Sequence, residues 1–273
     1  MLARIIAVVL LAPAALHAQE RRPSHCIAVA EAPGMEHVHR AAFAEPLADW
    51  TVRLSFIDHA MVMIETPGGL RAVTDYTGFI GRTRLPDVVT MNRAHISHWT
   101  PDPDPGIARV LPGWSETVGA PVDHWIETGD LVVRSVSTDI RSSGGAGVEE
   151  NGNAIFVFEV AGLCIGHLGH LHHEPTDAQY AALGRLDVVM APVDGGLTLD
   201  LPTMIRVLET LQANVVIPVH WFGPGSLDRF LEGMADDFAV ERPGGNSWEV
   251  SLDTLPRERT IVVLDPAFLT EPG

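Results

Sequence analysis

Three apolar, strand-like stretches of this chain run directly into histidines, and this feature constrains the fold more than any other. The stretches are residues 88–91, 163–166 and 215–219, and His59 follows a fourth stretch that ends at Ile57. Strand ends are rigid and their loops can close over a site, so these histidines are expected along one edge of a sheet. The histidines that follow the three stretches are His95, His98, His167, His170, His172, His173 and His220.

The order of the expected elements predicts two sheets packed face to face with helices outside. Short β-branched or apolar runs dominate the chain up to residue 166, and strands then alternate with helices. Helices are expected at residues 175–183, 201–211 and 226–234, the last with Ser226 as its N-cap. Residues 144–152 are rich in glycine and acidic side chains, so a mobile loop is expected there.

The N-terminus has the layout of a cleaved secretory signal peptide. A positively charged start precedes an almost wholly apolar run at residues 5–16, and Ala18 then leads into polar chain. The run is too short to span a bilayer as a helix, although a retained anchor or a buried helix is the alternative. The expected segments are a signal peptide at 1–18, a lead-in at 19–50 and one domain at 51–273. The protein is therefore expected to be periplasmic or secreted.

The chain is strongly acidic, with 18 Lys and Arg against 35 Asp and Glu and a net charge of −17 at pH 7. Nucleic acids and anionic membranes bind basic surfaces, so neither is expected as a partner. No stretch after the signal peptide is long and apolar enough for stable membrane insertion. A small-molecule substrate is the expected partner.

The two cysteines, Cys26 and Cys164, lie far apart in the sequence. They could pair in an oxidising compartment, but two cysteines do not establish a disulfide framework. Cys164 lies within an apolar strand-like run, so we expect a buried free thiol there.

Histidines gathered at one sheet edge favour a metal site, because neutral imidazole is the commonest nitrogen ligand for zinc and similar ions. Three protein ligands and a water form an open site, in which the ion lowers the pKa of the water. The alternative is that each histidine is a separately satisfied polar residue at a strand end. Four clusters after four apolar strands favour the shared site.

The order of these segments resembles the metallo-β-lactamase-fold hydrolases, and in particular the branch around the ascorbate-6-phosphate lactonase. The residues that carry the resemblance are Asp58-His59-Ala60 before Ile64-Glu65-Thr66, Asp75-Tyr76, Asp87 to Thr90, His167-Leu168-Gly169, Asp187 to Gly196, and Ile217 to Trp221. The resemblance implies an α/β fold, the αββα sandwich of two mixed β-sheets with outer helices. It also implies a metal site at one edge of the paired sheets.

The chain departs from the ligand pattern of this family at several positions. Where the family has H-x-H-x-D-H, the corresponding residues are Arg93, His95, Ser97 and His98. A further family histidine has no counterpart within residues 137–141. The metal-bridging aspartate of the family, which follows a glycine, is replaced by His170, whereas the last ligand, His220, is present.

The remaining ligands predict one divalent metal ion held by His98, His170 and His220. His95 is expected to be a fourth ligand or to lie just behind the ligands. The charge of Arg93 would repel a second cation. Zinc is the expected metal, and copper or iron would also fit three imidazoles.

Three further residues are candidates for catalysis. Arg93, like Arg141, could orient a carboxylate or phosphate, which would make the substrate anionic; alternatively it pairs with an acid such as Asp139. Asp75 is a candidate general base or a partner of a histidine, and it could equally cap a turn. His59 could line the pocket or support a ligand.

These features predict a hydrolase that attacks an ester, lactone, amide or phosphoester with a metal-bound hydroxide. One alternative is a non-catalytic periplasmic protein that binds a metal or another ligand and derives from a hydrolase. Another is a histidine-ligated redox centre, because several imidazoles without a carboxylate would also suit copper.

Overall fold

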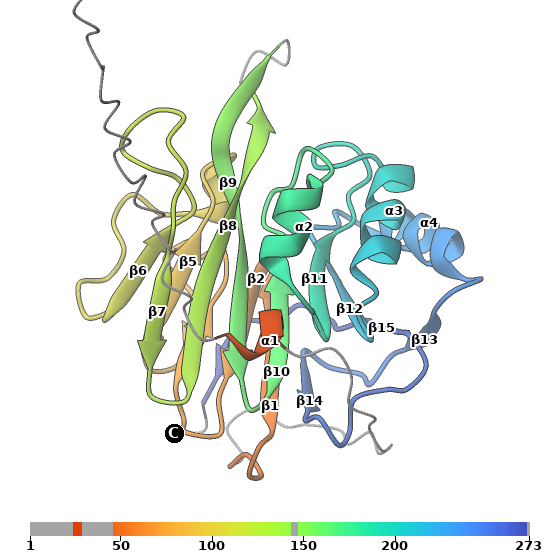
Figure 1. Ribbon diagram of the computed structural model, residues 1–273. Helices are drawn as coiled ribbons and strands as arrows, with labels where there is room; N and C mark the ends of the chain where they lie inside the picture. The colour runs from red at the N-terminus through yellow and green to blue at the C-terminus, as the bar shows by residue number, and fades with distance from the viewer. Residues whose placement is uncertain (1–23, 29–45, 143–146, 272–273) are drawn as a thin grey trace, which may run out of the picture.

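The computed structural model describes residues 24–28, 46–142 and 147–271 of the chain. Two β-sheets pack face to face, and α-helices cover the outer side of the larger sheet (Figure 1). The expected α/β sandwich of two mixed sheets with outer helices is therefore confirmed. The signal peptide expected at residues 1–18 lies outside the described residues, as does most of the lead-in at 19–50.

The smaller sheet has six strands in the order β14-β1-β2-β3-β5-β6. Its strands are β1 (Val52–Asp58), β2 (Met61–Glu65), β3 (Arg71–Val73), β5 (Val88–Met91), β6 (Arg109–Pro112) and β14 (Ser247–Val250). Strand β14 and the β1–β2–β3 meander are antiparallel, whereas β3, β5 and β6 run parallel to one another.

The larger sheet has eight strands in the order β13-β15-β12-β11-β10-β9-β8-β7. Its strands are β7 (Trp125–Thr128), β8 (Leu131–Arg141), β9 (Val148–Val160), β10 (Leu163–His167), β11 (Val188–Pro192), β12 (Val215–Val219), β13 (Ala239–Glu241) and β15 (Thr260–Val262). Strands β10, β11, β12 and β15 are parallel neighbours, so their carboxyl ends lie at one edge of the sheet. A separate two-stranded pair consists of β4 (Gly81–Arg82) and β16 (Leu269–Thr270).

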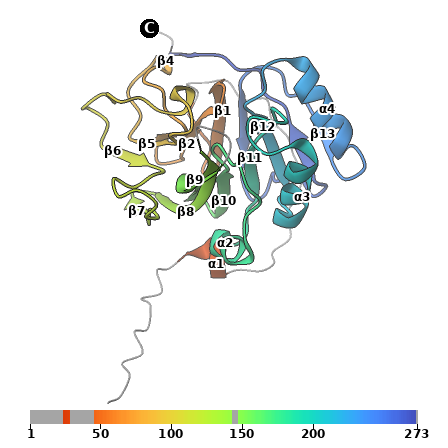
Figure 2. The ribbon, with the colours of Figure 1, turned by 90° about the horizontal axis from the view of Figure 1, so that it is seen from above.

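The described α-helices lie on the outer face of the eight-stranded sheet, as the view from above shows (Figure 2). They are α1 (His25–Ala28), α2 (Asp177–Leu183), α3 (Leu201–Leu211) and α4 (Pro224–Met234), and a short 3₁₀ helix η1 spans Ile96–His98. Thr176 and Gln179 form a capping box at the start of α2, and Asp200 caps α3. None of these helices is long and apolar enough to cross a bilayer.

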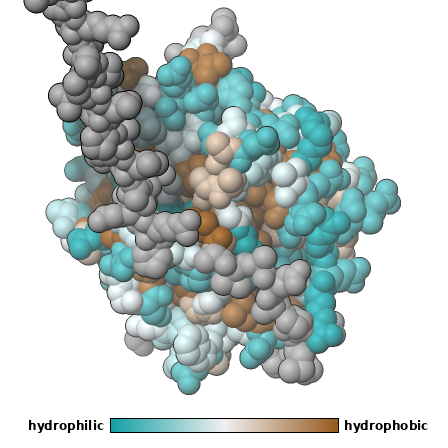
Figure 3. Space-filling model, viewed as in Figure 1, coloured by the Kyte–Doolittle hydropathy of each residue, from teal (hydrophilic) through white to brown (hydrophobic). Residues whose placement is uncertain are grey.

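Three apolar clusters correspond to the layers of the sandwich. The cluster between the sheets includes Phe56, Phe156, Phe158 and Trp248. A second cluster joins the outer face of the eight-stranded sheet to the helices. The outer face of the six-stranded sheet is covered by loops and the β4–β16 pair. The described surface in Figure 3 is mainly hydrophilic, with apolar patches between, in keeping with the acidic composition.

Two local predictions are wrong. Of the stretch expected to be a mobile loop at 144–152, residues 144–146 lie outside the described residues, but residues from Val148 onward belong to β9, because they pair with the end of β8. The resulting hairpin extends beyond the neighbouring strands (Figure 1). Helix α4 begins at Pro224 with Gly223 as its N-cap, two residues before the expected Ser226. Proline at the start of a helix has the φ angle that the first turn needs.

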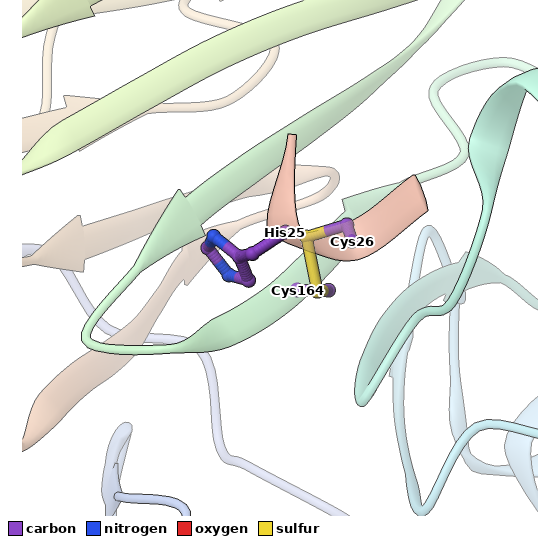
Figure 4. Close-up of side chains that lie close together, drawn as sticks. All are labelled: His25, Cys26 and Cys164. Atoms are coloured by element: carbon purple, nitrogen blue, oxygen red, sulfur yellow. A yellow bond between two sulfur atoms is a disulfide. The ribbon is translucent and has the colours of Figure 1, made fainter. Parts of the chain in front are cut away.

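The prediction of a free thiol at Cys164 is also wrong, because Cys26 and Cys164 form a disulfide (Figure 4). The bond attaches α1 to β10. Two further contacts hold this segment: the Ser24 hydroxyl donates to Glu159 at 2.6 Å, and the Arg185 backbone N–H donates to the Cys26 carbonyl at 2.9 Å. The N-terminal segment is thereby attached to the outer face of the eight-stranded sheet.

We predict that the Cys26→Ala/Cys164→Ala protein is less stable by about 2–5 kcal/mol, because the disulfide closes a long loop in the unfolded chain. Urea unfolding of both proteins measures the difference. Wild-type protein unfolded in the presence of a reductant is the matched control and should show the same loss. Labelling of two thiols by a maleimide in native, non-reduced protein would contradict the assignment.

Candidate metal centre

The candidate site is built at the carboxyl ends of strands from both sheets. His59 follows β1, Asp75 follows β3 by two residues, and His98 lies in η1 after β5. From the other sheet, β10 leads into the loop with His170, and β12 ends directly before His220. Strand ends from two packed layers therefore bring these side chains to one edge of the sandwich.

Three imidazole rings form a nearly equilateral triangle at this edge. The ring centroids of His98 and His170 are 4.7 Å apart, those of His98 and His220 are 4.9 Å apart, and those of His170 and His220 are 5.0 Å apart. Three imidazoles bound tetrahedrally to one zinc ion have their centroids about 5 Å apart. The structure thus brings together the three ligands that the sequence predicts.

His59 joins the same cluster from the six-stranded sheet, the sheet that also leads to His98. The ligand nitrogens of His59, His98 and His220 all lie within 4.8 Å of one another. However, the His59 and His220 ring centroids are only 3.9 Å apart, which is closer than two rings that share one metal ion. We therefore assign His59 to the wall of the centre.

A carboxylate lies beside each of two buried histidines of the triangle. His98 Nδ1 lies 2.5 Å from Asp75 Oδ2, and His220 Nδ1 lies 3.0 Å from Asp194 Oδ2. His98 Nδ1 is hydrogen-bonded to Asp75, whereas His220 Nδ1 contacts Asp194 without hydrogen-bond alignment; with the proton on Nδ1, each ring presents the lone pair of Nε2. The two Nε2 atoms face each other at 3.1 Å, a separation that suits two ligands of one cation.

His170 and His167 are both buried, but their hydrogen bonding differs. His167 Nε2 donates to the Ala60 carbonyl at 3.0 Å, and its Nδ1 accepts the Gly169 N–H at 3.2 Å. Neither ring nitrogen of His170 has a hydrogen-bond partner among the described residues. A buried nitrogen without a partner is costly, so His170 fits a metal ligand and His167 fits a structural role.

The loop that carries His170 is held by two buried asparagines. Asn153 accepts the His170 backbone N–H at 2.8 Å, and Asn92 donates to Asp75 at 2.9 Å. Gly169 has a φ of 61°, and a Cβ atom there would collide with the side chains of both asparagines. Glycine is therefore required immediately before His170.

Burial keeps three histidines of the centre, His59, His98 and His170, neutral. Together with the neighbouring His220 and His98, it lowers the pKa of His59 to about 3. Burial also lowers the pKa values of His98 and His170, and again nearby histidines add to the effect. Neutral imidazole is the form that binds metal ions, so the ligands are ready at neutral pH.

The two carboxylates differ in how they are stabilised. Burial raises the pKa of Asp75 to about 6, although His167 and the hydrogen bond from Asn92 oppose this shift. Burial would also raise the pKa of Asp194, but hydrogen bonds from His220 and from the hydroxyl and N–H of Thr198 bring it below its ordinary value. Asp194 is therefore a stable anion beside His220.

No role for Asp194 follows from the sequence, because its role depends on the contact with His220, which only the fold creates. The available signal was its position, two residues after the buried strand β11 and directly before a glycine pair. Sequence reasoning also left His172 unassigned. Its ring lies 4.6 Å from His170, and its Nδ1 accepts the Arg141 backbone N–H at 2.7 Å.

His95 is exposed, and its ring centroid lies 4.8 Å from that of His170. It therefore stands at the outer side of the ligand triangle. Asp75 is buried, with its two carboxylate oxygens on His98 and Asn92, so the structure favours its role as a histidine partner over that of a general base.

The two arginines near the centre are engaged within the protein. Arg93 forms an ion pair with Glu149 of the β8–β9 hairpin. It therefore pairs with an acid, as one of the two interpretations of the sequence had it, but the acid is Glu149. Asp139, the acid suggested for it, accepts the Asn151 N–H instead. The Arg141 guanidinium donates to the backbone carbonyls of residues 196, 197 and 198.

Three site residues have left-handed backbone conformations, which are rare for residues other than glycine. The φ angles are 49° at His59, 43° at Asp75 and 55° at His220. The His220 N–H donates to the His59 carbonyl at 2.6 Å and so joins two of these turns. Strain of this kind persists where surrounding structure imposes it, and it is concentrated at functional sites.

Comparison with known proteins agrees with this geometry. Residues 53–220 match the family model described as "Beta-lactamase superfamily domain", and the chain belongs to this superfamily. The narrower resemblance to the ascorbate-6-phosphate lactonase branch stays a prediction. A search of curated proteins gives no match.

Solved structures have the same fold. A proposed Zn-dependent hydrolase of the metallo-beta-lactamase superfamily from Thermotoga maritima is 26% identical, with a TM-score of 0.55 over 78% of this chain and 98% of its own. A proposed metal-dependent hydrolase from Parabacteroides distasonis is 13% identical, with a TM-score of 0.52 over 68% of this chain and 89% of its own. The second similarity concerns the fold alone.

We predict that His170→Ala weakens zinc binding by more than about 100-fold, because loss of a residue behind a ligand already costs 10–100-fold. His59→Ala is the matched control and should retain one equivalent of zinc. Elemental analysis of protein purified without a metal-affinity tag, followed by competition with a chelator, measures both. Loss of zinc in His59→Ala with retention in His170→Ala would assign the third ligand to His59.

Proposed function

We propose that this protein is an exported, metal-dependent hydrolase that cleaves an ester, lactone, amide or phosphoester. The proposal rests on the buried imidazoles of His98 and His220, whose Nε2 atoms lie 3.1 Å apart and whose Nδ1 atoms each lie beside a carboxylate. Membership of the beta-lactamase superfamily supports it, and so does the similarity to the Thermotoga protein described as a Zn-dependent hydrolase.

The residues fit a single metal ion, and zinc is the ion that we expect. His98, His170 and His220 would hold it, with Asp75 and Asp194 fixing the rings of the first and last. Such an ion lowers the pKa of a bound water and polarises the bond to be cleaved.

The other site residues shape the place where the substrate lies. His59 packs beside His220 and stays neutral, so it can exchange hydrogen bonds with the substrate without adding charge. Asp75 acts through His98 and is a positioning residue. His170 in place of an acidic ligand leaves an all-imidazole set, which holds a divalent ion without placing an anion beside the attacking oxygen.

The export proposal rests on the N-terminal sequence and on the disulfide between Cys26 and Cys164. Disulfides persist in oxidising compartments such as the periplasm and are rare in the cytosol. Cys26 follows the expected cleavage site, so it would remain in the mature chain and could pair with Cys164 after export.

We predict that the mature protein begins at Gln19 and is found in the periplasm or the medium. Fractionation of the producing cell and mass spectrometry of the purified chain test this. Recovery of a chain that begins at residue 1 from the cytosol or the membrane fraction would contradict it.

We predict that zinc-loaded protein hydrolyses p-nitrophenyl acetate or bis(p-nitrophenyl) phosphate and that Asp194→Asn lowers zinc affinity about 10–100-fold. The change keeps the size of the side chain but removes the charge that orients His220. Asp253→Asn, at an exposed position, is the control and should behave as the wild type. Release of nitrophenolate and chelator titration give the readouts.

Two results would contradict the hydrolase proposal. Tight metal binding without turnover of either substrate class would favour a binding protein. An intense visible absorption band from copper or iron in the purified protein would favour a redox centre.

A further inference from the structure

Exposed apolar side chains lie on three loops that carry residues of the metal centre. Phe222 is 66% exposed, and its ring centroid lies 5.2 Å from that of His59 and 5.3 Å from that of His220. Ile96, 75% exposed, begins the 3₁₀ helix that ends at His98.

The third of these residues is Leu197, which is 53% exposed. Its backbone N–H donates to Asp194 at 2.5 Å, and Asp194 in turn contacts His220. We call Phe222, Ile96 and Leu197 together the apolar rim. Single exposed apolar residues are ordinary, but the exposed Phe222 ring lies against two histidines of the centre, where it can contact a bound ligand.

The charges around the centre disfavour an anionic ligand. Arg93 is neutralised by Glu149, and the Arg141 guanidinium is occupied by three backbone carbonyls. The Asp194 carboxylate lies close behind His220, with its Oδ2 atom 3.0 Å from His220 Nδ1. A carboxylate or phosphate on the substrate would meet no free arginine of this pair, and it would be repelled by the acidic chain.

We propose that the substrate is a neutral carboxylic ester or lactone with an apolar acyl group, which packs against the apolar rim; this rests on the proposed hydrolase function. Water adds its oxygen to the acyl carbon, and the bond from that carbon to the alcohol oxygen breaks. One proton of the water passes to the departing alcohol oxygen. The products are a carboxylic acid and an alcohol, or one hydroxy acid from a lactone.

Within the apolar rim, Phe222 is the residue that determines acyl-chain specificity. Its ring is the one that directly contacts both His59 and His220, so an acyl chain beside the reacting carbonyl would lie against it. Because apolar burial rises with chain length, its contribution should be larger for a long acyl group than for acetate.

The test is kcat/KM of zinc-loaded protein for p-nitrophenyl acetate and p-nitrophenyl octanoate, with bis(p-nitrophenyl) phosphate as the anionic comparison. We expect the octanoate to be preferred over the acetate by about tenfold or more. Phe222→Ala should lower the octanoate-to-acetate ratio about tenfold, and Phe222→Leu should restore much of it. Phe268→Ala, at a position 52% exposed and in contact with Phe79, is the matched control and should leave the ratio unchanged.

The outcomes separate this inference from the proposed function. Zinc-dependent turnover without a chain-length preference, or with an unchanged ratio in Phe222→Ala, would overturn the inference and leave the hydrolase standing. A preference for the phosphodiester would do the same. Absence of zinc-dependent turnover of all three substrates by protein with full zinc content would overturn both.

Discussion

A buried histidine needs a partner for each ring nitrogen, and this requirement organises the whole centre. His167 meets it within the protein, with the Ala60 carbonyl on one nitrogen and the Gly169 N–H on the other. At His98 and His220 a carboxylate lies beside only one ring nitrogen, Nδ1, while the Nε2 atoms of the two rings face each other. Unmatched polar atoms in a dry interior cost about 1–3 kcal/mol each. A cation between the two rings removes this cost, so metal binding and stability of the centre are coupled.

The two sheets make this arrangement attainable. Strands β10, β11 and β12 pair in parallel, so the loops that follow them begin at the same edge of the sheet. Strands β1 and β3 bring His59 and Asp75 to this edge from the facing sheet. Left-handed conformations at His59, Asp75 and His220 turn the chain abruptly where each strand ends. Each costs on the order of 1–3 kcal/mol, and rigid strands on both sides can hold it. The centre is therefore a property of the packed sandwich more than of any one loop.

The sequence was sufficient for features that depend on local pattern. Strand β5 has the predicted bounds, and β12 runs directly into His220, because fully buried strands appear as continuous apolar runs. Features that depend on a distant partner were not predictable in this way. The sequence around Cys164 is that of an ordinary buried strand, and only the fold places Cys26 next to it. In the same way, the role of Asp194 depends on its contact with His220, which follows the neighbouring strand. The segment 148–151 is Val-Glu-Glu-Asn, which is too polar for a strand prediction, and it forms a strand because it pairs with the end of β8.

Charge balance explains how a centre with so few acidic ligands can hold a divalent ion. An imidazole ligand brings no negative charge, but Asp75 and Asp194 stand directly behind two of the three predicted ligands, and together their ionised forms match the two charges of one ion. A bound cation next to His98 would itself favour the ionised form of Asp75 over the protonated form that burial promotes. Among the described residues, no further carboxylate contacts these rings to support a second divalent ion, and the positive charge of Arg93 is paired with Glu149. A site built on His170, with no acidic ligand, would thus favour one ion and no excess charge, which is the electrostatic setting that a neutral substrate needs.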